Sequence, residues 1–172
     1  MRRGLVLIGL VLLLALLLAP PDLSAPAQFF RIQYVIDGDT VVLANGEHVR
    51  LVQIDSPELR GSECYGGQAR AVLRRMLPPG TTVRVEADPR LDQVDRYGHL
   101  LRYIFLGPTN INLQLVRVGA ATVWFYDHDR GKYAGALLQA GLAARATHRG
   151  LWGVCPGTPF DVYHSADTGP GR

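Results

Sequence analysis

Short runs of β-forming apolar residues, separated by turn residues, make up the chain between residues 33 and 55. One run covers residues 40–43 and another covers residues 49–54, with Asn45-Gly46 between them. Asn-Gly in this setting favours a tight hairpin, because both residues accept the positive φ angles that the turn requires. The pattern therefore predicts that the two runs pair as an antiparallel hairpin, with a further β-forming pair at Val35 and Ile36 before it.

Apolar residues return at helical spacing after this region. Ala69, Val72, Leu73 and Met76 repeat at i, i+3, i+4 and i+7, which predicts a helix over residues 66–77. Pro78-Pro79-Gly80 follows directly and ends it. Two more helices are expected over residues 109–118 and 133–148, the second continuing to residue 153, and strands over residues 81–87, 99–106 and 122–126.

The first 27 residues have the pattern of an export signal. Arg2 and Arg3 precede an uninterrupted apolar run over residues 4–19, and Ala25-Pro26-Ala27 supplies a cleavage pattern that leaves Gln28 as the first mature residue. An uncleaved membrane anchor is the alternative. The apolar run is shorter than the roughly 20 residues that span a bilayer, which favours cleavage. The expected location is secreted or periplasmic, or else membrane-anchored outside the cytoplasm.

The remaining chain is long enough for one domain with a hydrophobic core. It shows no internal repeat and no second domain. The segment after Cys155 consists largely of Gly, Pro, Ser, Asp and Thr with few residues to bury, so residues 156–172 are expected to be a disordered tail. The predicted domain therefore covers residues 28–155.

The chain contains two cysteines, Cys64 and Cys155. An even pair in an exported protein suits one disulfide, which would join the loop after the second acidic cluster to the end of the chain. A metal site built on these two residues lacks partners at ligand spacing. An unpaired or intermolecular state stays open.

The candidate chemistry lies in two acidic clusters at the borders of the predicted hairpin. Asp37-Gly38-Asp39-Thr40 enters the first strand and Asp55-Ser56-Pro57-Glu58 leaves the second, so Asp39 and Asp55 lie at the same open end. Arg50 lies nearer the turn on a plain hairpin count and reaches that end only if the sheet is strongly coiled. The alternative is that both clusters are solvated turns or the start of a loop or helix.

These residue types suit phosphodiester hydrolysis. Two converging carboxylates and a backbone oxygen bind a hard cation such as Ca²⁺. A third carboxylate, Glu58, can act as general base on a water molecule. The guanidinium of Arg50 can bind a phosphate with two hydrogen bonds.

Several motifs in one order give the chain a resemblance to the staphylococcal nuclease (thermonuclease) family, from about Gln33 to Trp152. They are VIDGDTVVL, VRLVQIDSPE, ECYGGQA, DRYGHLLRY, NLQLVRVGAA and GLWG. The resemblance implies an α+β fold, an OB-type five-stranded β-barrel with three helices. It also implies a Ca²⁺-dependent endonuclease of DNA and RNA that prefers single strands and acts as a monomer.

The resemblance also assigns roles to single residues. Asp39 and Asp55 match the metal-binding carboxylates, and Ser56 matches the position that gives a backbone carbonyl to the metal. Glu58 matches the proposed general base, and Arg50 matches the first of two catalytic arginines.

The chain departs from the family at the second catalytic arginine, where it has His99. Histidine can donate a hydrogen bond, but it cannot form a two-pronged contact and its charge depends on pH. Arg96, in the preceding loop, is a possible substitute. We therefore expect a weakened or pH-shifted nuclease.

Arg96, Tyr97, Phe125 and Tyr126 are candidates for substrate contacts. Tyr97 matches a nucleotide-contacting tyrosine, with Arg96 as its basic neighbour, and Phe125 falls where the family has a tyrosine that stacks on a base. Tyr126 or Trp124 can share that task. The alternative is packing, in the core for Trp124 and in a turn for Tyr97.

Two other classes of function compete with the nuclease. One is a non-catalytic OB-fold module that binds single-stranded nucleic acid, which His99 favours and the intact Asp39, Asp55, Glu58 and Arg50 disfavour. The other is an anchored surface protein with a role in adhesion or uptake. The formal net charge of +3 is too small to establish nucleic-acid binding by itself.

Overall fold

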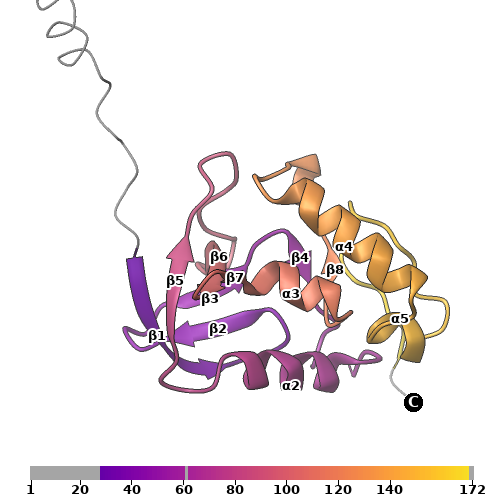
Figure 1. Cartoon of the computed structure of the whole chain (residues 1–172), viewed down its shortest axis with the longest axis horizontal. Coiled ribbons are helices and arrows are strands. Elements are labelled where there is room, and N and C mark those ends of the chain that lie inside the picture. Colours follow the sequence, from indigo (N-terminus) through magenta and orange to yellow (C-terminus); the bar gives the residue numbers. More distant parts are fainter. Residues whose placement is uncertain (1–27, 61, 171–172) are drawn as a thin grey trace, which may run out of the picture.

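Five strands close into a barrel in the computed structural model, which describes residues 28–60 and 62–170 (Figure 1). The strands are β1 (Gln28–Val35), β2 (Thr40–Leu43), β3 (His48–Leu51), β5 (Thr82–Glu86) and β6 (Leu100–Leu106). The predicted export signal or membrane anchor, residues 1–27, lies outside the described residues.

The strand order β3-β2-β1-β5-β6 is antiparallel throughout, and a parallel pairing of β3 with β6 closes the barrel. In that closing pair Val49 lies opposite Leu100 and Leu51 lies opposite Arg102. A short strand, β7 (Thr109–Asn110), extends the sheet beside β6. The architecture confirms the predicted α+β fold with an OB-type barrel.

The predicted hairpin forms, but its second strand is shorter than expected. β3 ends at Leu51, and Gln53 adopts a positive φ of 65° that breaks the extended chain. The chain then forms β4 (Ile54–Asp55), which pairs with β8 (Thr122–Val123) outside the barrel. The break turns Asp55 away from the line of the hairpin.

Arg50 lies at the open end of the hairpin and not near its turn, so that expectation was wrong. Thr40 pairs with Arg50 and Val42 pairs with His48, which leaves β3 only one residue beyond Arg50. Arg50 therefore lies beside Asp39 without any need for strong coiling of the sheet.

Three helices form where the sequence predicts them: α2 (Gly66–Met76), α3 (Ile111–Arg117) and α4 (Ala134–Ala146). The expected continuation of α4 is instead a separate helix, α5 (Leu151–Val154), and a 3₁₀ turn covers Tyr126–His128. The helix is interrupted before α5 where Gly150, with a positive φ of 56°, lies against Gly119. A Cβ on Gly119 would lie 2.1 Å from the Arg149 carbonyl oxygen, and a Cβ on Gly150 would lie 2.2 Å from the Gly119 carbonyl oxygen. No helix in residues 28–60 and 62–170 is both long and apolar enough to cross a membrane.

The barrel interior and the faces of α2, α3 and α4 share one hydrophobic core. Asn112, on α3, is buried within it and joins the helix to the barrel. Its side-chain oxygen accepts from the Ile104 N–H (3.0 Å), and its amide nitrogen donates to the Val52 carbonyl (2.9 Å). The second bond holds Val52, in the chain between β3 and β4, just before Asp55.

Cys64 and Cys155 form a disulfide, as the sequence predicts. The expectation of a disordered tail after it was wrong, because residues 156–170 lie against the domain (Figure 1). The Phe160 ring packs against Trp152, with centroids 5.6 Å apart, and the Val162 carbonyl accepts from the Phe125 N–H (2.7 Å). A few well-placed apolar residues and the disulfide thus hold a segment whose composition is typical of disorder.

Candidate active site

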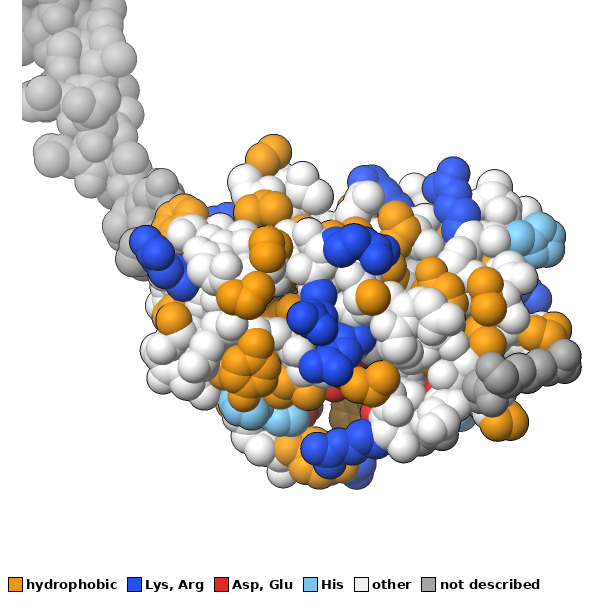
Figure 2. All heavy atoms as spheres, turned by 90° about the horizontal axis from the view of Figure 1, so that it is seen from below, with side chains coloured by type: hydrophobic (Ala, Val, Ile, Leu, Met, Phe, Trp, Pro, Cys, Tyr) orange, Lys and Arg blue, Asp and Glu red, His pale blue; other side chains and the backbone are white. Residues whose placement is uncertain are grey.

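A cleft of about 790 Å³ opens beside the end of the β2–β3 hairpin. The loop before β6, the segment after β8 and the C-terminal segment form its other walls. The lining residues that carry charge or an aromatic ring are Asp37, Arg50, Asp55, Glu58, Glu63, Asp92, Asp95, Arg96, Tyr97, His99, Trp124, Tyr126 and Asp129. Figure 2 shows a hollow with acidic side chains at its bottom and Lys or Arg side chains at its rim.

Arg50 joins the two predicted metal-binding carboxylates at the bottom of the cleft. Its Nη1 atom donates to Asp39 Oδ1 (2.7 Å) and its Nη2 atom donates to Asp55 Oδ1. The two carboxylates therefore each direct one oxygen toward the same guanidinium at the open end of the hairpin.

Gly38 lets the first acidic turn approach the second. A Cβ on Gly38 would lie 2.6 Å from the Ser56 Cβ and 2.8 Å from the Ala69 Cβ on α2, so no larger residue fits there. The approach allows the Ser56 N–H to donate to Asp39 Oδ2 (2.8 Å). Ser56 is thus buried directly beside Asp39, where its backbone was expected to contribute.

The site contains more negative than positive groups. Burial, and then the charge of Asp39, raise the pKa of Asp37 to about 6 and that of Asp55 to about 7. Burial favours a lower pKa for Arg50, but the charges of Asp39 and Asp55 outweigh it and raise that pKa, so the guanidinium stays charged. One guanidinium does not neutralise three carboxylates, and the cluster has a net affinity for cations.

The donor set fits a hard divalent cation that takes part of its coordination from elsewhere. Within residues 28–60 and 62–170, no group of three or more His, Cys, Asp or Glu side chains is arranged to hold a metal ion. Asp39 and Asp55 supply two converging carboxylates, so the remaining ligands would be backbone oxygen, water or substrate phosphate, which Ca²⁺ and Mg²⁺ accept.

Glu58 lies at the edge of the same cleft and is exposed to solvent. Desolvation, and then the charge of Asp39, raise its pKa above the ordinary value. Its backbone N–H donates to Glu63 Oε2 (2.9 Å), which holds the start of the loop. A carboxylate with a raised pKa is a better proton acceptor than an ordinary one, as a general base requires.

His99 also lines the cleft, and it has a carboxylate partner that the sequence did not reveal. Its Nδ1 atom lies 2.9 Å from Asp95 Oδ2, and its ring stacks on His48 with centroids 5.5 Å apart. The backbone N–H groups of Tyr97 and His99 donate to Asp95 Oδ1 (2.8 and 2.9 Å). The i, i+4 spacing of Asp95 and His99 across a Tyr-Gly turn was the available signal.

Arg96 and Tyr97 lie together at the mouth of the cleft, as expected of substrate-contacting residues. The Arg96 guanidinium lies over the Tyr97 ring, 4.8 Å from its centroid. The side chain of Tyr97 is 69% exposed, so one face of its ring is open to a ligand.

Phe125 does not face the cleft, and its predicted stacking role was wrong. It is completely buried in the core, whereas Tyr126 is 65% exposed and lines the cleft with Trp124. The Trp124 and Tyr126 rings meet edge to face at 5.5 Å, and the Arg50 guanidinium lies 5.5 Å from the Trp124 ring centroid. Neighbouring residues in an extended segment face opposite sides. Because Phe125 faces the core, its two neighbours, Trp124 and Tyr126, are the residues whose rings can stack on a base.

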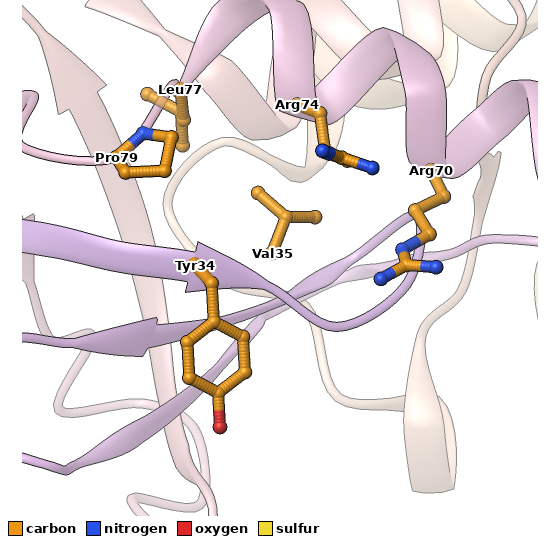
Figure 3. A pocket seen from close by; sticks show the side chains of 6 residues that line it. All are labelled: Tyr34, Val35, Arg70, Arg74, Leu77 and Pro79. Atoms are coloured by element: carbon orange, nitrogen blue, oxygen red, sulfur yellow. The ribbon is translucent and has the colours of Figure 1, made fainter.

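A second, smaller hollow of about 150 Å³ lies between β1 and α2 (Figure 3). Arg70 and Arg74 on α2 and Tyr34 on β1 line it, with Val35, Leu77 and Pro79. None of its lining residues is acidic, so it lacks the groups that bind a cation or accept a proton. The candidate chemistry is therefore confined to the larger cleft.

Comparisons with known proteins agree with this geometry. A family model described as staphylococcal nuclease homologue matches residues 48–154. The thermonuclease of Staphylococcus hyicus is 30% identical over 136 residues, 75% of this chain and 78% of that protein. An uncharacterized endonuclease of Haemophilus influenzae is 33% identical over 150 residues, 83% of this chain and 78% of that protein. The barrel, the order of its motifs and these matches show that the chain belongs to the staphylococcal nuclease family.

Proposed function

We propose that the protein is a Ca²⁺-dependent endonuclease that hydrolyses phosphodiester bonds in DNA and RNA. The observation that carries the proposal is the convergence of Asp39 and Asp55 on Arg50, in a cleft that Glu58 also lines. The names of the relatives, thermonuclease and endonuclease, support the same class of reaction.

Asp39, Asp55 and the Ser56 carbonyl are the residues that would hold Ca²⁺. When bound, the ion polarises a phosphate oxygen and stabilises the charge of the transition state. Arg50 would bind the phosphate through the two N–H groups that donate to Asp39 and Asp55 in this structure, and it would fix the orientation of the phosphorus atom toward the attacking water.

Glu58 accepts a proton from that water as a new bond forms between its oxygen and phosphorus. The bond from phosphorus to the leaving sugar oxygen breaks, that oxygen takes a proton from solvent water, and protonated Glu58 returns its proton to solvent. His99, oriented by Asp95, is the group at the second electrophile position and stabilises the charge that grows on the phosphate and on the leaving oxygen.

Exposed rings around the cleft favour single-stranded substrates. Tyr97, Trp124 and Tyr126 offer ring faces or edges to unpaired bases, and stacking on bases does not depend on their sequence. In a duplex those base faces are already stacked on one another. We therefore propose single-stranded DNA and RNA as preferred substrates and a monomer as the active form.

The proposed location is outside the cytoplasm. The disulfide between Cys64 and Cys155 supports an oxidising compartment. The pattern of residues 1–27 favours a secreted or periplasmic enzyme after cleavage, with a membrane-anchored form as the alternative. N-terminal sequencing of the exported product separates the two forms.

The proposal is tested by digestion of circular single-stranded DNA, linear RNA and duplex DNA with purified residues 28–172. Cleavage of the circle establishes endonuclease action, because a circle has no ends. We expect cleavage with Ca²⁺, none with a chelator, and the highest rate on the single strands. Salt-sensitive binding of all three nucleic acids without cleavage would contradict the proposal and favour the alternative, a non-catalytic OB-fold module. The presence of His99 in place of the family's second catalytic arginine is the observation that supports this alternative.

A further inference from the structure

The C-terminal segment, residues 156–170, lies outside the residues that match the family model and yet reaches the acidic cluster. The backbone N–H of Ala166 donates to Asp55 Oδ2 (2.7 Å). Ser165 and Ala166 also line the cleft, beside Asp55 and Glu58. A segment that was expected to be disordered thus contributes a wall and a hydrogen bond to the candidate active site.

Both ends of this segment are attached at one residue, Cys64. The segment starts after Cys155, whose sulfur is bonded to Cys64. It returns so that the Gly169 carbonyl accepts from the Cys64 N–H (2.9 Å) and the Thr168 hydroxyl donates to the Cys64 carbonyl (2.8 Å). Ala166 is therefore held by a loop closed at its base and not by a free chain end.

Side-chain contacts hold the middle of the segment against the domain. Tyr163 accepts a hydrogen bond from Arg130 Nη2 (2.8 Å), and its ring lies 4.4 Å from that of His128. The Phe160 ring packs near Gly141 on α4 and the Arg145 guanidinium. These contacts fix the path of the backbone before Ser165 and Ala166, and the bonds of Thr168 and Gly169 to Cys64 fix it after them.

The two oxygens of Asp55 have different partners. Oδ2 accepts from the Ala166 N–H, while Oδ1 accepts from Arg50 Nη2. A backbone donor on Oδ2 orients the carboxylate and favours its charged form. The contact with Ala166 does not occupy Oδ1, the oxygen on which a cation would take the place of Arg50.

We propose that the C-terminal segment is a working part of the active site, in which the Ala166 N–H is the positioning group for Asp55. The inference rests on the proposed Ca²⁺-dependent function for its catalytic consequence. The affinity of the site for a cation should therefore depend on the packing of residues 161–170 against the domain.

The test uses residues 28–172 and the variant Ala166→Pro, which removes the N–H. Ala166→Ser keeps the N–H and is the matched control, and a chain ending at His164 removes the contact without adding a proline. Calorimetric titration measures Ca²⁺ affinity, and amide hydrogen exchange of the metal-free protein measures protection of Ala166. Thermal unfolding reports on the fold, and cleavage of single-stranded DNA is followed separately.

We expect a protected Ala166 amide in the parent chain. Ala166→Pro and the shortened chain should bind Ca²⁺ about tenfold more weakly than the parent, as for other losses of a hydrogen bond to a metal ligand, and Ala166→Ser should bind it more tightly than Ala166→Pro does. The inference would be overturned if Ala166→Pro bound Ca²⁺ as tightly as the parent or more tightly, or if it cleaved DNA faster. It would also be overturned if Ala166→Pro bound Ca²⁺ more weakly while the shortened chain did not.

The outcomes separate this inference from the proposed function. A parent chain that binds Ca²⁺ but cleaves nothing, with weaker binding in Ala166→Pro, supports the positioning role and removes the nuclease. A parent chain that cleaves DNA, with Ala166→Pro equal to it in affinity and rate, keeps the nuclease and removes the positioning role.

Discussion

Nδ1 of His99 lies 2.9 Å from Oδ2 of Asp95, whose other oxygen accepts the His99 backbone N–H. Burial favours a higher pKa for Asp95, but these donors, the Tyr97 N–H and the charge of His99 outweigh it and lower that pKa. Asp95 is therefore a charged partner that fixes the orientation of the imidazole, with the other ring nitrogen left for a ligand.

His99→Arg should raise the cleavage rate. Arginine is always charged and donates from several N–H groups, whereas the imidazole of His99, with Nδ1 against Asp95, has one ring nitrogen left for the substrate. An additional hydrogen bond contributes about 1 kcal/mol, so we expect a gain of roughly fivefold. Steady-state rates of the two proteins check it, and an equal rate in both would contradict the expectation that His99 weakens the nuclease.

Arg50→Lys should lower kcat by about a hundredfold or more with the fold intact. The guanidinium of Arg50 donates from two nitrogens to Asp39 and Asp55, and a single ammonium group cannot reproduce that fork. Arg31→Lys, an exposed change on β1, is the matched control. Circular dichroism and kcat measured together check the prediction, which a kcat within twofold of the parent would rule out.

Tyr126→Ala should weaken substrate binding, whereas Phe125→Ala should lower the stability of the fold. Tyr126 is exposed in the cleft, so its loss should weaken binding of single-stranded DNA by about 1–3 kcal/mol and leave stability unchanged. Phe125 is buried in the core, so its loss should destabilise the fold by about 3–5 kcal/mol. KM and urea unfolding of both variants test this, and a raised KM in a stable Phe125→Ala protein would restore the original assignment.

Glu86 should contribute to a loss of stability in acid. Burial favours a higher pKa for this carboxyl, but hydrogen bonds from Lys132, Arg84 and Tyr133 outweigh it and lower the pKa. A lowered pKa in the folded state means that the stabilisation is fully present above the unfolded-state pKa and is lost as pH falls through the lower, folded-state pKa.

The test is Glu86→Gln, which should lower the free energy of unfolding by about 1 kcal/mol at pH 7 and flatten its decline between pH 5 and 3. Urea unfolding at several pH values measures both quantities. A variant whose stability falls as steeply with acid as that of the parent would contradict the assignment.

The sequence predicts the fold and most of the site because their signals are local. The Asn-Gly turn, the helical spacing around Leu73 and the two acidic clusters each depend on a few neighbouring residues. The closure of the barrel by β3 and β6 follows from the family resemblance and not from any local pattern.

What the sequence missed depends on tertiary contacts. The bend at Gln53 is held by its side chain, whose Nε2 atom donates to the Asp129 carbonyl and whose Oε1 atom accepts from the Gly131 N–H, both far away in the chain. The hairpin register that places Arg50 beside Asp39 depends on the length of the loop between β2 and β3. Which of the rings of Trp124, Phe125 and Tyr126 points inward depends on which of them fits the core. The contact of Ala166 with Asp55 uses a backbone N–H, which leaves no mark in the sequence.

The most direct test of the proposed nuclease is the single-turnover cleavage rate of a single-stranded oligonucleotide with Ca²⁺ for the parent chain and for Glu58→Gln. The account predicts a fall of about 10²–10⁴-fold for Glu58→Gln, with Ca²⁺ affinity kept, because glutamine cannot accept the proton of the attacking water. Glu47→Gln, the same change at an exposed turn, should cleave as the parent does. Equal rates for the parent and Glu58→Gln would contradict the account.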